Sequence, residues 1–89
     1  METNTKILMF KLPDCDPCAQ LTSWIETEAK EVVDLITQYT TPDDLPMFKA
    51  KRVSGAPQII VMQGEIELHR AKGFDGCVDL IKRIIEDDY

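Results

Sequence analysis

The stretch KILMFKLPDCDPC, residues 6–18, decides how this chain is expected to fold. Its first part, residues 6–11, is an apolar run with a lysine at each end, typical of a β-strand buried on both faces. Its last part, the motif CDPC at residues 15–18, comes directly before a helical pattern. Two cysteines at this spacing can form and reopen a disulfide, and the partial positive charge of the helix end favours the attacking thiolate. The motif therefore predicts a redox-active dithiol directly after a central strand.

The remaining sequence predicts alternating helices and strands, without a linker or an internal repeat. Pro17 falls in the first turn of the helix that follows the dithiol, where its missing N–H does no harm. Residues 31–39 predict a second strand, parallel to the first because a helix connects the two. The predicted elements in chain order are a strand at 6–11, a helix at 15–30, a strand at 31–39, a short helix at 45–51, a hairpin of strands at 58–63 and 66–69, and a helix from Asp75 or Gly76.

Length and composition predict one globular domain over residues 1–89. The chain has 44% hydrophobic and 29% charged residues, which is ordinary for a protein with a single core. A net charge of −6 argues against nucleic acid or an anionic membrane surface as a partner, since phosphate binding needs clustered Lys and Arg. Residues 1–6 lack the apolar segment of a secretory signal, and no apolar run could span a membrane. We therefore expect a cytoplasmic monomer.

The three cysteines do not predict a disulfide framework, because their number is odd and the expected compartment is reducing. Half of a zinc site is the structural alternative for the CDPC motif, although only Cys77 and His69 remain to complete four ligands. Cys77 falls on the apolar face of the last helix, which favours a core position over a regulatory thiol. In the hairpin, Ile66 and Leu68 alternate with polar residues that include His69, so one face and that histidine are expected to be solvated. Trp24 is expected to pack without a functional role.

Three motifs together resemble the glutaredoxins and other small thioredoxin-fold redoxins. They are the dithiol at the first helix, Gly55-Ala56-Pro57 entering the hairpin, and Gly73-Phe74-Asp75 before the last helix. The resemblance covers nearly the whole chain and implies an α/β thioredoxin fold of the glutaredoxin type, with the order βαβαββα and a four-stranded mixed sheet flanked by helices. Thioredoxin proper is disfavoured, since its usual tryptophan and glycine beside the dithiol are absent and so are its extra N-terminal strand and helix.

The resemblance also implies the roles of individual residues around the dithiol. Cys15 attacks a substrate disulfide and Cys18 resolves the mixed disulfide. Pro57 resembles the cis-proline that faces the active site, and the backbone of Ala56 pairs with an incoming peptide. Asp16 and Pro17 are assigned to the same substrate-binding set.

A glutathione site is the finer implication of the resemblance. Lys11 looks like the lysine that holds a glutathione carboxylate and supports the thiolate. Gly73, Phe74 and Asp75 resemble the segment that receives the γ-glutamyl end at a helix N-terminus. Lys72 stands where the first of two glycines is usual. Glutathione is therefore expected as a co-substrate, with no metal and no permanently bound cofactor.

The expected function is that of a dithiol–disulfide oxidoreductase acting on protein or glutathione mixed disulfides. Glutathione or a flavin-dependent disulfide reductase would reduce it, and ribonucleotide reductase is a typical client of the family. Asp14 and Asp16 flank Cys15, and their negative charge raises the pKa of its thiol, which predicts a relatively reducing protein. The alternatives are a thioredoxin-like redoxin reduced by thioredoxin reductase, an iron–sulfur module in which Cys15 and glutathione hold a cluster between two subunits, and a redox-inert adaptor.

Overall fold

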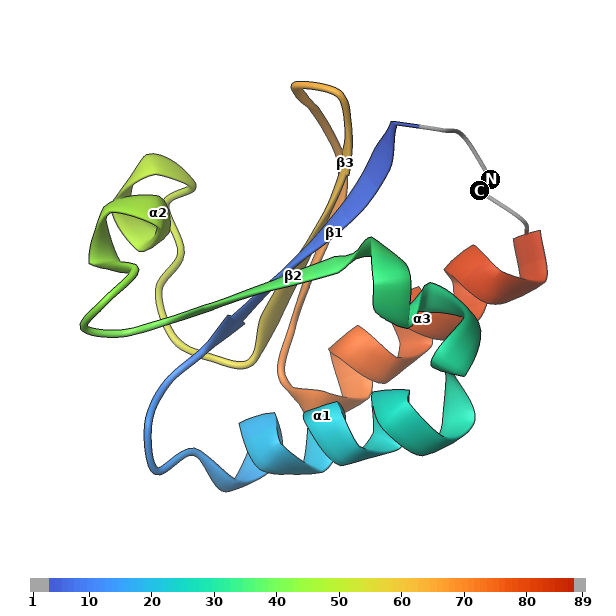
Figure 1. Ribbon diagram of the computed structural model, residues 1–89, viewed down its shortest axis with the longest axis horizontal. Helices are drawn as coiled ribbons and strands as arrows, with labels where there is room; N and C mark the ends of the chain where they lie inside the picture. The colour runs from blue at the N-terminus through green and yellow to red at the C-terminus, as the bar shows by residue number, and fades with distance from the viewer. Residues whose placement is uncertain (1–3, 88–89) are drawn as a thin grey trace.

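Strand β1 (Thr5–Lys11) lies inside a four-stranded sheet, as its apolar sequence predicts. The computed structural model describes residues 4–87, so residues 1–3, 88 and 89 of the expected domain lie outside the description. The sheet has the order β2-β1-β3-β4, in which β2 is parallel to β1 while β3 and β4 form an antiparallel hairpin (Figure 1). The other elements are α1 (Asp16–Glu28), the 3₁₀ helix η1 (Lys30–Leu35), β2 (Ile36–Thr40), α2 (Leu45–Ala50), β3 (Gln58–Gln63), β4 (Ile66–Lys72) and α3 (Phe74–Asp87). The mixed sheet flanked by helices is confirmed.

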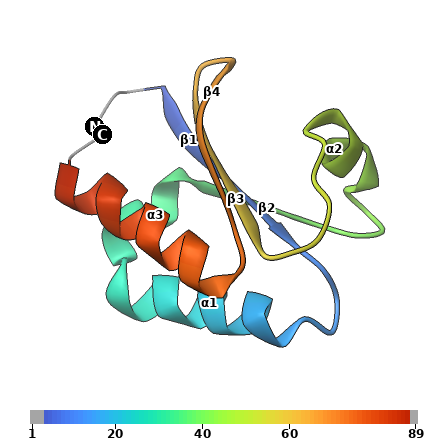
Figure 2. The ribbon, with the colours of Figure 1, turned by 180° about the vertical axis from the view of Figure 1, so that it is seen from behind.

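The larger core lies between one face of the sheet and the helices α1 and α3 (Figures 1 and 2). Its sheet side consists of alternate residues of β1 and β3, because successive side chains of a strand point to opposite faces. Its helix side consists of apolar residues at helical spacing. The main members are Ile7, Met9, Ile59 and Val61 from the sheet, Leu21 and Ile25 from α1, and Leu80, Ile81 and Ile84 from α3.

A smaller core lies on the opposite face, under α2. Phe10 is fully buried there and contacts two other rings. Phe48 of α2 packs edge-on at 5.0 Å between ring centroids, and Tyr39 of β2 stacks at 5.2 Å. These contacts fix α2 over the end of β1 that leads to the dithiol.

The strand predicted at 31–39 is wrong in its first half. Residues 30–35 form η1, and β2 is confined to Ile36–Thr40. Val32 is fully buried while Val33 is 40% exposed, and Leu35, three positions after Val32, packs against the core again. A spacing of three is the period of a 3₁₀ helix, in which residues i and i+3 share a face.

The solvated position predicted for His69 is also wrong. Ile66 is 66% exposed and Leu68 is 38% exposed, whereas His69 is half-buried. A register shift between Val61 and Met62 places His69 opposite Val61, on the face that carries α1 and α3. The extra residue of such a shift moves the residues after it, His69 among them, to the face opposite the one that simple alternation predicts.

The register brings four strand ends together at one edge of the sheet. Lys11 pairs with Thr40, Phe10 pairs with Gln58, and Gln58 in turn pairs with Lys72. The chain leaves β1 at this edge and enters α1 through residues 12–15. The edge is therefore where the dithiol, the start of β3 and the end of β4 meet. Within residues 4–87, no helix is both long and apolar enough to span a membrane.

Candidate functional site

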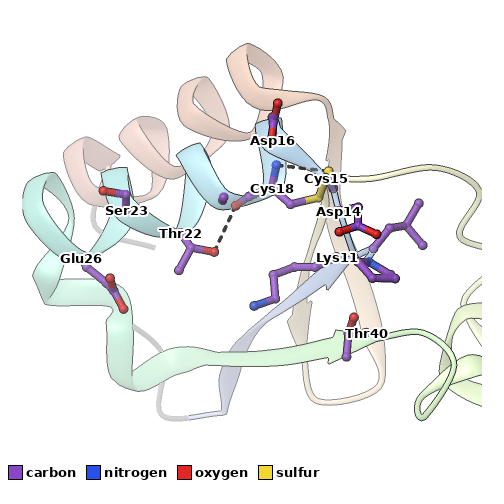
Figure 3. Close-up of a pocket in the computed structure, with 12 residues that line it drawn as sticks. Lys11, Asp14, Cys15, Asp16, Cys18, Thr22, Ser23, Glu26 and Thr40 are labelled. Atoms are coloured by element: carbon purple, nitrogen blue, oxygen red, sulfur yellow. Dashed lines mark hydrogen bonds between the residues drawn. A yellow bond between two sulfur atoms is a disulfide. The ribbon is translucent and has the colours of Figure 1, made fainter.

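A disulfide joins Cys15 and Cys18 at the N-terminus of α1. Their Cα atoms are 5.2 Å apart, and Cys15 is the N-cap residue of the helix. The backbone N–H of Cys18 donates a hydrogen bond to Cys15 Sγ at 3.2 Å (Figure 3). This sulfur therefore occupies the position where a free N–H of the first helical turn stabilises negative charge.

The two sulfurs differ in their access to solvent. Cys18 is 3% exposed, whereas Cys15 is half-buried at the tip of the helix. A substrate can therefore reach Cys15 directly, while Cys18 lies behind it. The preceding turn contains Asp14 with φ of +56°, a conformation that aspartate tolerates better than most residues.

An open pocket of about 590 Å³ adjoins the disulfide on the side of β2. It contains Lys11, Asp16 and both cysteines from the predicted site. Lys11 extends from the end of β1 into the space between α1 and β2 (Figure 3). Among the described residues, no carboxylate forms an ion pair with its ammonium group. The other lining residues are Leu12, Pro13, Asp14, Ala19, Thr22, Ser23, Glu26 and Thr40.

Three polar residues of α1 that line the pocket were not predicted from the sequence. They are Thr22, Ser23 and Glu26. Thr22 Oγ1 donates a hydrogen bond to the carbonyl oxygen of Cys18 at 3.1 Å. Helical spacing from Cys15 could have found them, because residues three or four positions apart share a helix face.

The segment before β3 lies at the same end of the sheet as the dithiol. The Ala56–Pro57 peptide bond is cis, which confirms the conformation predicted for Pro57, while its role in substrate binding stays a prediction. Pro57 comes directly before Gln58, the partner of Phe10, so it lies at the same edge of the sheet as Lys11. Ala56, Pro57, Gly73, Phe74 and Asp75 do not line the pocket, so the predicted site residues fall on two separate sides.

No family model and no curated protein matches this chain. Solved structures of thioredoxins do. Mitochondrial thioredoxin 3 of Saccharomyces cerevisiae, in its oxidized form, superimposes with a TM-score of 0.78 and 14% identity over 96% of this chain and 80% of that one. Thioredoxin of Trichomonas vaginalis gives 0.76 with 23% identity over 98% and 81%, and that of Fasciola hepatica gives 0.71 with 19% identity over 92% and 82%. The chain has a thioredoxin fold. The glutaredoxin type of that fold stays a prediction.

In this thioredoxin fold, the cis-proline segment is fastened to the start of α3. The backbone N–H of Gly73 donates a hydrogen bond to the carbonyl oxygen of Pro57 at 2.8 Å. That N–H is consequently engaged and not free for a ligand. Phe74 packs against the larger core, and Asp75 is exposed in the first turn of α3. The glutathione contacts assigned to this segment therefore depend on Asp75 and the N–H groups after Gly73.

Cys77 is a core residue of the thioredoxin fold, as predicted. It is fully buried, and its thiol faces the carbonyl oxygens of Ala71 at 3.6 Å and Pro57 at 3.9 Å. Burial raises the pKa of this thiol from 9.0 to about 12, against a smaller opposing effect of a backbone hydrogen bond at Ile59. Cys77 therefore remains protonated and inaccessible near neutral pH.

The residues between Asn4 and Asp87 contain no group of three or more His, Cys, Asp and Glu side chains arranged to hold a metal ion. Trp24 packs against the larger core from its edge, in agreement with the packing role predicted for it.

Proposed function

We propose that the protein is a dithiol–disulfide oxidoreductase, which reduces protein disulfides or glutathione mixed disulfides through Cys15 and Cys18. The observation that carries this proposal is the Cys15–Cys18 disulfide at the start of α1 in a thioredoxin fold, with Cys15 on the solvent side. The disulfide bond itself contributes little to the stability of the fold, since two cysteines three residues apart close only a short loop.

The reaction begins with the reduced pair. The Cys15 thiolate attacks one sulfur of the substrate disulfide, a Cys15–substrate bond forms, and the other substrate sulfur leaves and takes up a proton. The Cys18 thiol then loses its proton and attacks Cys15 Sγ. The Cys15–Cys18 bond forms, and the second substrate sulfur is released as a thiol. Two electrons have passed from the protein to the substrate; one of the two protons comes from Cys18 and the other from the solvent, to which Cys15 had already lost its proton.

The first helical turn supports the attacking sulfur. The Cys18 N–H already points at Cys15 Sγ in the oxidised protein, and in the reduced protein the same N–H stabilises the thiolate. The ammonium of Lys11 in the adjoining pocket adds positive charge on the side of β2. Both effects act against the carboxylates of Asp14 and Asp16.

The cis-proline segment supplies the surface on which a peptide docks. Within residues 4–87, the Ala56 N–H and C=O groups have no backbone partner, and Pro57 is held in place through Gly73. An extended peptide can therefore pair with Ala56 as an added strand, which places its cysteine against Cys15. Asp16 and Pro17 flank the attacking sulfur on the helix and border the same peptide.

Glutathione is the reductant that we propose, as a co-substrate and without any permanently bound cofactor. Lys11 would take one of its carboxylates, and the start of α3 with Asp75 would take the γ-glutamyl end. A cytoplasmic monomer with ribonucleotide reductase among its clients is the setting that the resemblance suggests. The specific reason to keep a second candidate is that the similar solved structures are thioredoxins, so reduction by a flavin-dependent thioredoxin reductase is the alternative.

A coupled assay tests both candidates. Insulin or a glutathione mixed disulfide serves as substrate, and turnover with glutathione and glutathione reductase is compared with turnover with NADPH and thioredoxin reductase. Glutathione-driven turnover that Cys15→Ser abolishes, with a raised KM for glutathione in Lys11→Gln and Asp75→Asn, supports the glutathione site. Turnover with thioredoxin reductase alone supports the alternative, and turnover with neither contradicts the proposed function.

A further inference from the structure

Lys72 is the last residue of β4, and its backbone position is fixed beside the cis-proline segment. It pairs with Gln58 across the hairpin, one residue after Pro57. The next residue, Gly73, is hydrogen-bonded to the Pro57 carbonyl. The base of the Lys72 side chain therefore keeps a constant position relative to Ala56 and Pro57.

The side chain of Lys72 lies across Gly55. A methyl group built on Gly55 would lie 2.9 Å from Lys72 Cε, closer than such contacts are found, and 3.1 Å from Nζ, so the end of the lysine side chain would have to move. Gly55 has φ of +82°, in the left-handed region that favours glycine. A glycine at this position thus serves two purposes, because it makes the turn and leaves room for the lysine. The ammonium group consequently lies beside Gly55, the residue directly before Ala56. Ala56 is the residue whose backbone would pair with a peptide.

This ammonium has no partner within the described chain. Lys72 is exposed and forms no hydrogen bond or ion pair there, unlike Arg70 two residues earlier, which is paired with Glu67. The charged groups around the disulfide on the opposite side, toward β2, are mostly acidic, since Asp14, Asp16 and Glu26 line that pocket with Lys11. The pocket side of the disulfide is therefore mostly acidic, whereas the cis-proline segment at the same end of the sheet has beside it a cation without a partner among the described residues.

We propose that Lys72 is a specificity-determining residue that favours disulfide substrates with a carboxylate side chain next to the cysteine. The inference rests on the proposed function, because it concerns the peptide that pairs with Ala56. The ammonium over Gly55 meets the flanking side chain of such a peptide and attracts a glutamate or aspartate. An exposed pair of this kind changes the association rate and is screened by salt.

Peptide disulfides that differ only in the residues flanking the cysteine test this inference. One peptide has glutamates, one has lysines and one has glutamines. The reduced protein is mixed with each in a single turnover, and the second-order rate constant is measured for the wild type and Lys72→Gln. Lys6→Gln is the matched control, because Lys6 is also exposed but lies at the far end of β1, opposite Met62.

In Lys72→Gln, the rate with the glutamate peptide is expected to fall about twofold to fivefold, while the glutamine peptide is unaffected and the lysine peptide does not slow. Lys72→Arg should keep the wild-type preference, and 0.5 M NaCl should remove the difference. Equal effects on all three peptides, no effect, or the same effect in Lys6→Gln would overturn the role of Lys72 and leave the proposed function intact. A wild type that reduces none of the peptides would overturn both.

Discussion

The backbone N–H of Gly73 donates a hydrogen bond to the Pro57 carbonyl oxygen at 2.8 Å, and this bond joins the start of α3 to the cis-proline segment. Gly73 has φ of +82°, and a methyl group built on it would meet nothing within 4 Å. Glycine is therefore favoured at this position because of its left-handed backbone conformation, although there is enough space for a side chain.

Gly73→Ala is therefore expected to lower the free energy of unfolding by about 1 to 2 kcal/mol. Gly76→Ala is the matched control in the first turn of α3, where the new methyl group makes only an ordinary contact with Ala71 at 3.9 Å. That substitution should stabilise the protein by about 0.5 kcal/mol, because it removes backbone entropy from the unfolded chain. Urea denaturation of both variants checks the pair, and equal effects in the two variants would contradict this account of Gly73.

Gln58 offers a test of an unsatisfied buried group. It is 5% exposed, and its Oε1 atom has no hydrogen-bond partner among the described residues. Replacing it with methionine, which has a similar shape and no acceptor, should raise the free energy of unfolding by about 1 kcal/mol. The urea midpoint of Gln58→Met gives the answer, and a clear loss of stability would mean that the amide has a partner in solution.

Cys77 predicts a pH dependence of stability. Its pKa is raised to about 12 in the folded protein from 9.0, so the unfolded state loses this proton first. The stabilising contribution is fully present below pH 9 and is lost as the pH rises toward 12. The stability of Cys77→Ala, measured against pH, should lack this part of the alkaline decline and be lower by about 1 to 2 kcal/mol at pH 7.

Thiol counting gives a simpler check of the same residue. Cys77 is the free cysteine that remains when Cys15 and Cys18 are joined. The oxidised protein should show no reactive thiol while folded and one after denaturation. A thiol that reacts in the folded state would show that the start of α3, which buries Cys77, opens near neutral pH.

Asp14 and Asp16 are expected to slow the reaction of Cys15. Both line the pocket beside it, and their negative charge opposes formation of the thiolate. In the doubly substituted variant Asp14→Asn, Asp16→Asn, a lower pKa of the thiol should increase the rate of alkylation by iodoacetamide at pH 7 about twofold or more. Asp34→Asn in η1 removes an exposed carboxylate outside the pocket and should leave the rate unchanged. An unchanged rate in the double variant would mean that water screens both carboxylates.

Much of the fold could be predicted from the sequence, because local pattern and tertiary position agree in most elements. The apolar run of β1 and the helical spacing after Cys15 each had one interpretation. The β-branched residues Val32 and Val33 misled, since their preference for strands was outweighed by burial at a spacing of three in η1. The position of His69 in the hairpin was mispredicted for another reason. The register shift at Val61 cannot be recognised from the alternation of polar and apolar residues in β4.

The site was predictable in part. The dithiol and Pro57 carry chemistry that few residue types provide, so they could be found from the sequence. The contact between the Lys72 side chain and Gly55 could not be predicted, because it depends on the pairing of β4 with β3 and on the turn before β3. The pocket wall formed by Thr22 and Glu26 consists of ordinary polar helix residues, which acquire a role only through their position beside Cys15.

Trapping of the mixed disulfide tests the central claim most directly. The reduced Cys18→Ser variant is mixed with a disulfide substrate, and the adduct is located by mass spectrometry of the digested protein. A stable adduct on Cys15, absent from Cys15→Ser, is the predicted result. The Cys18→Ser variant lacks the thiol that would otherwise break the bond between Cys15 and the substrate. An adduct on Cys77, or none on Cys15 while the wild type reduces the same substrate, would contradict the assignment of Cys15 as the attacking group.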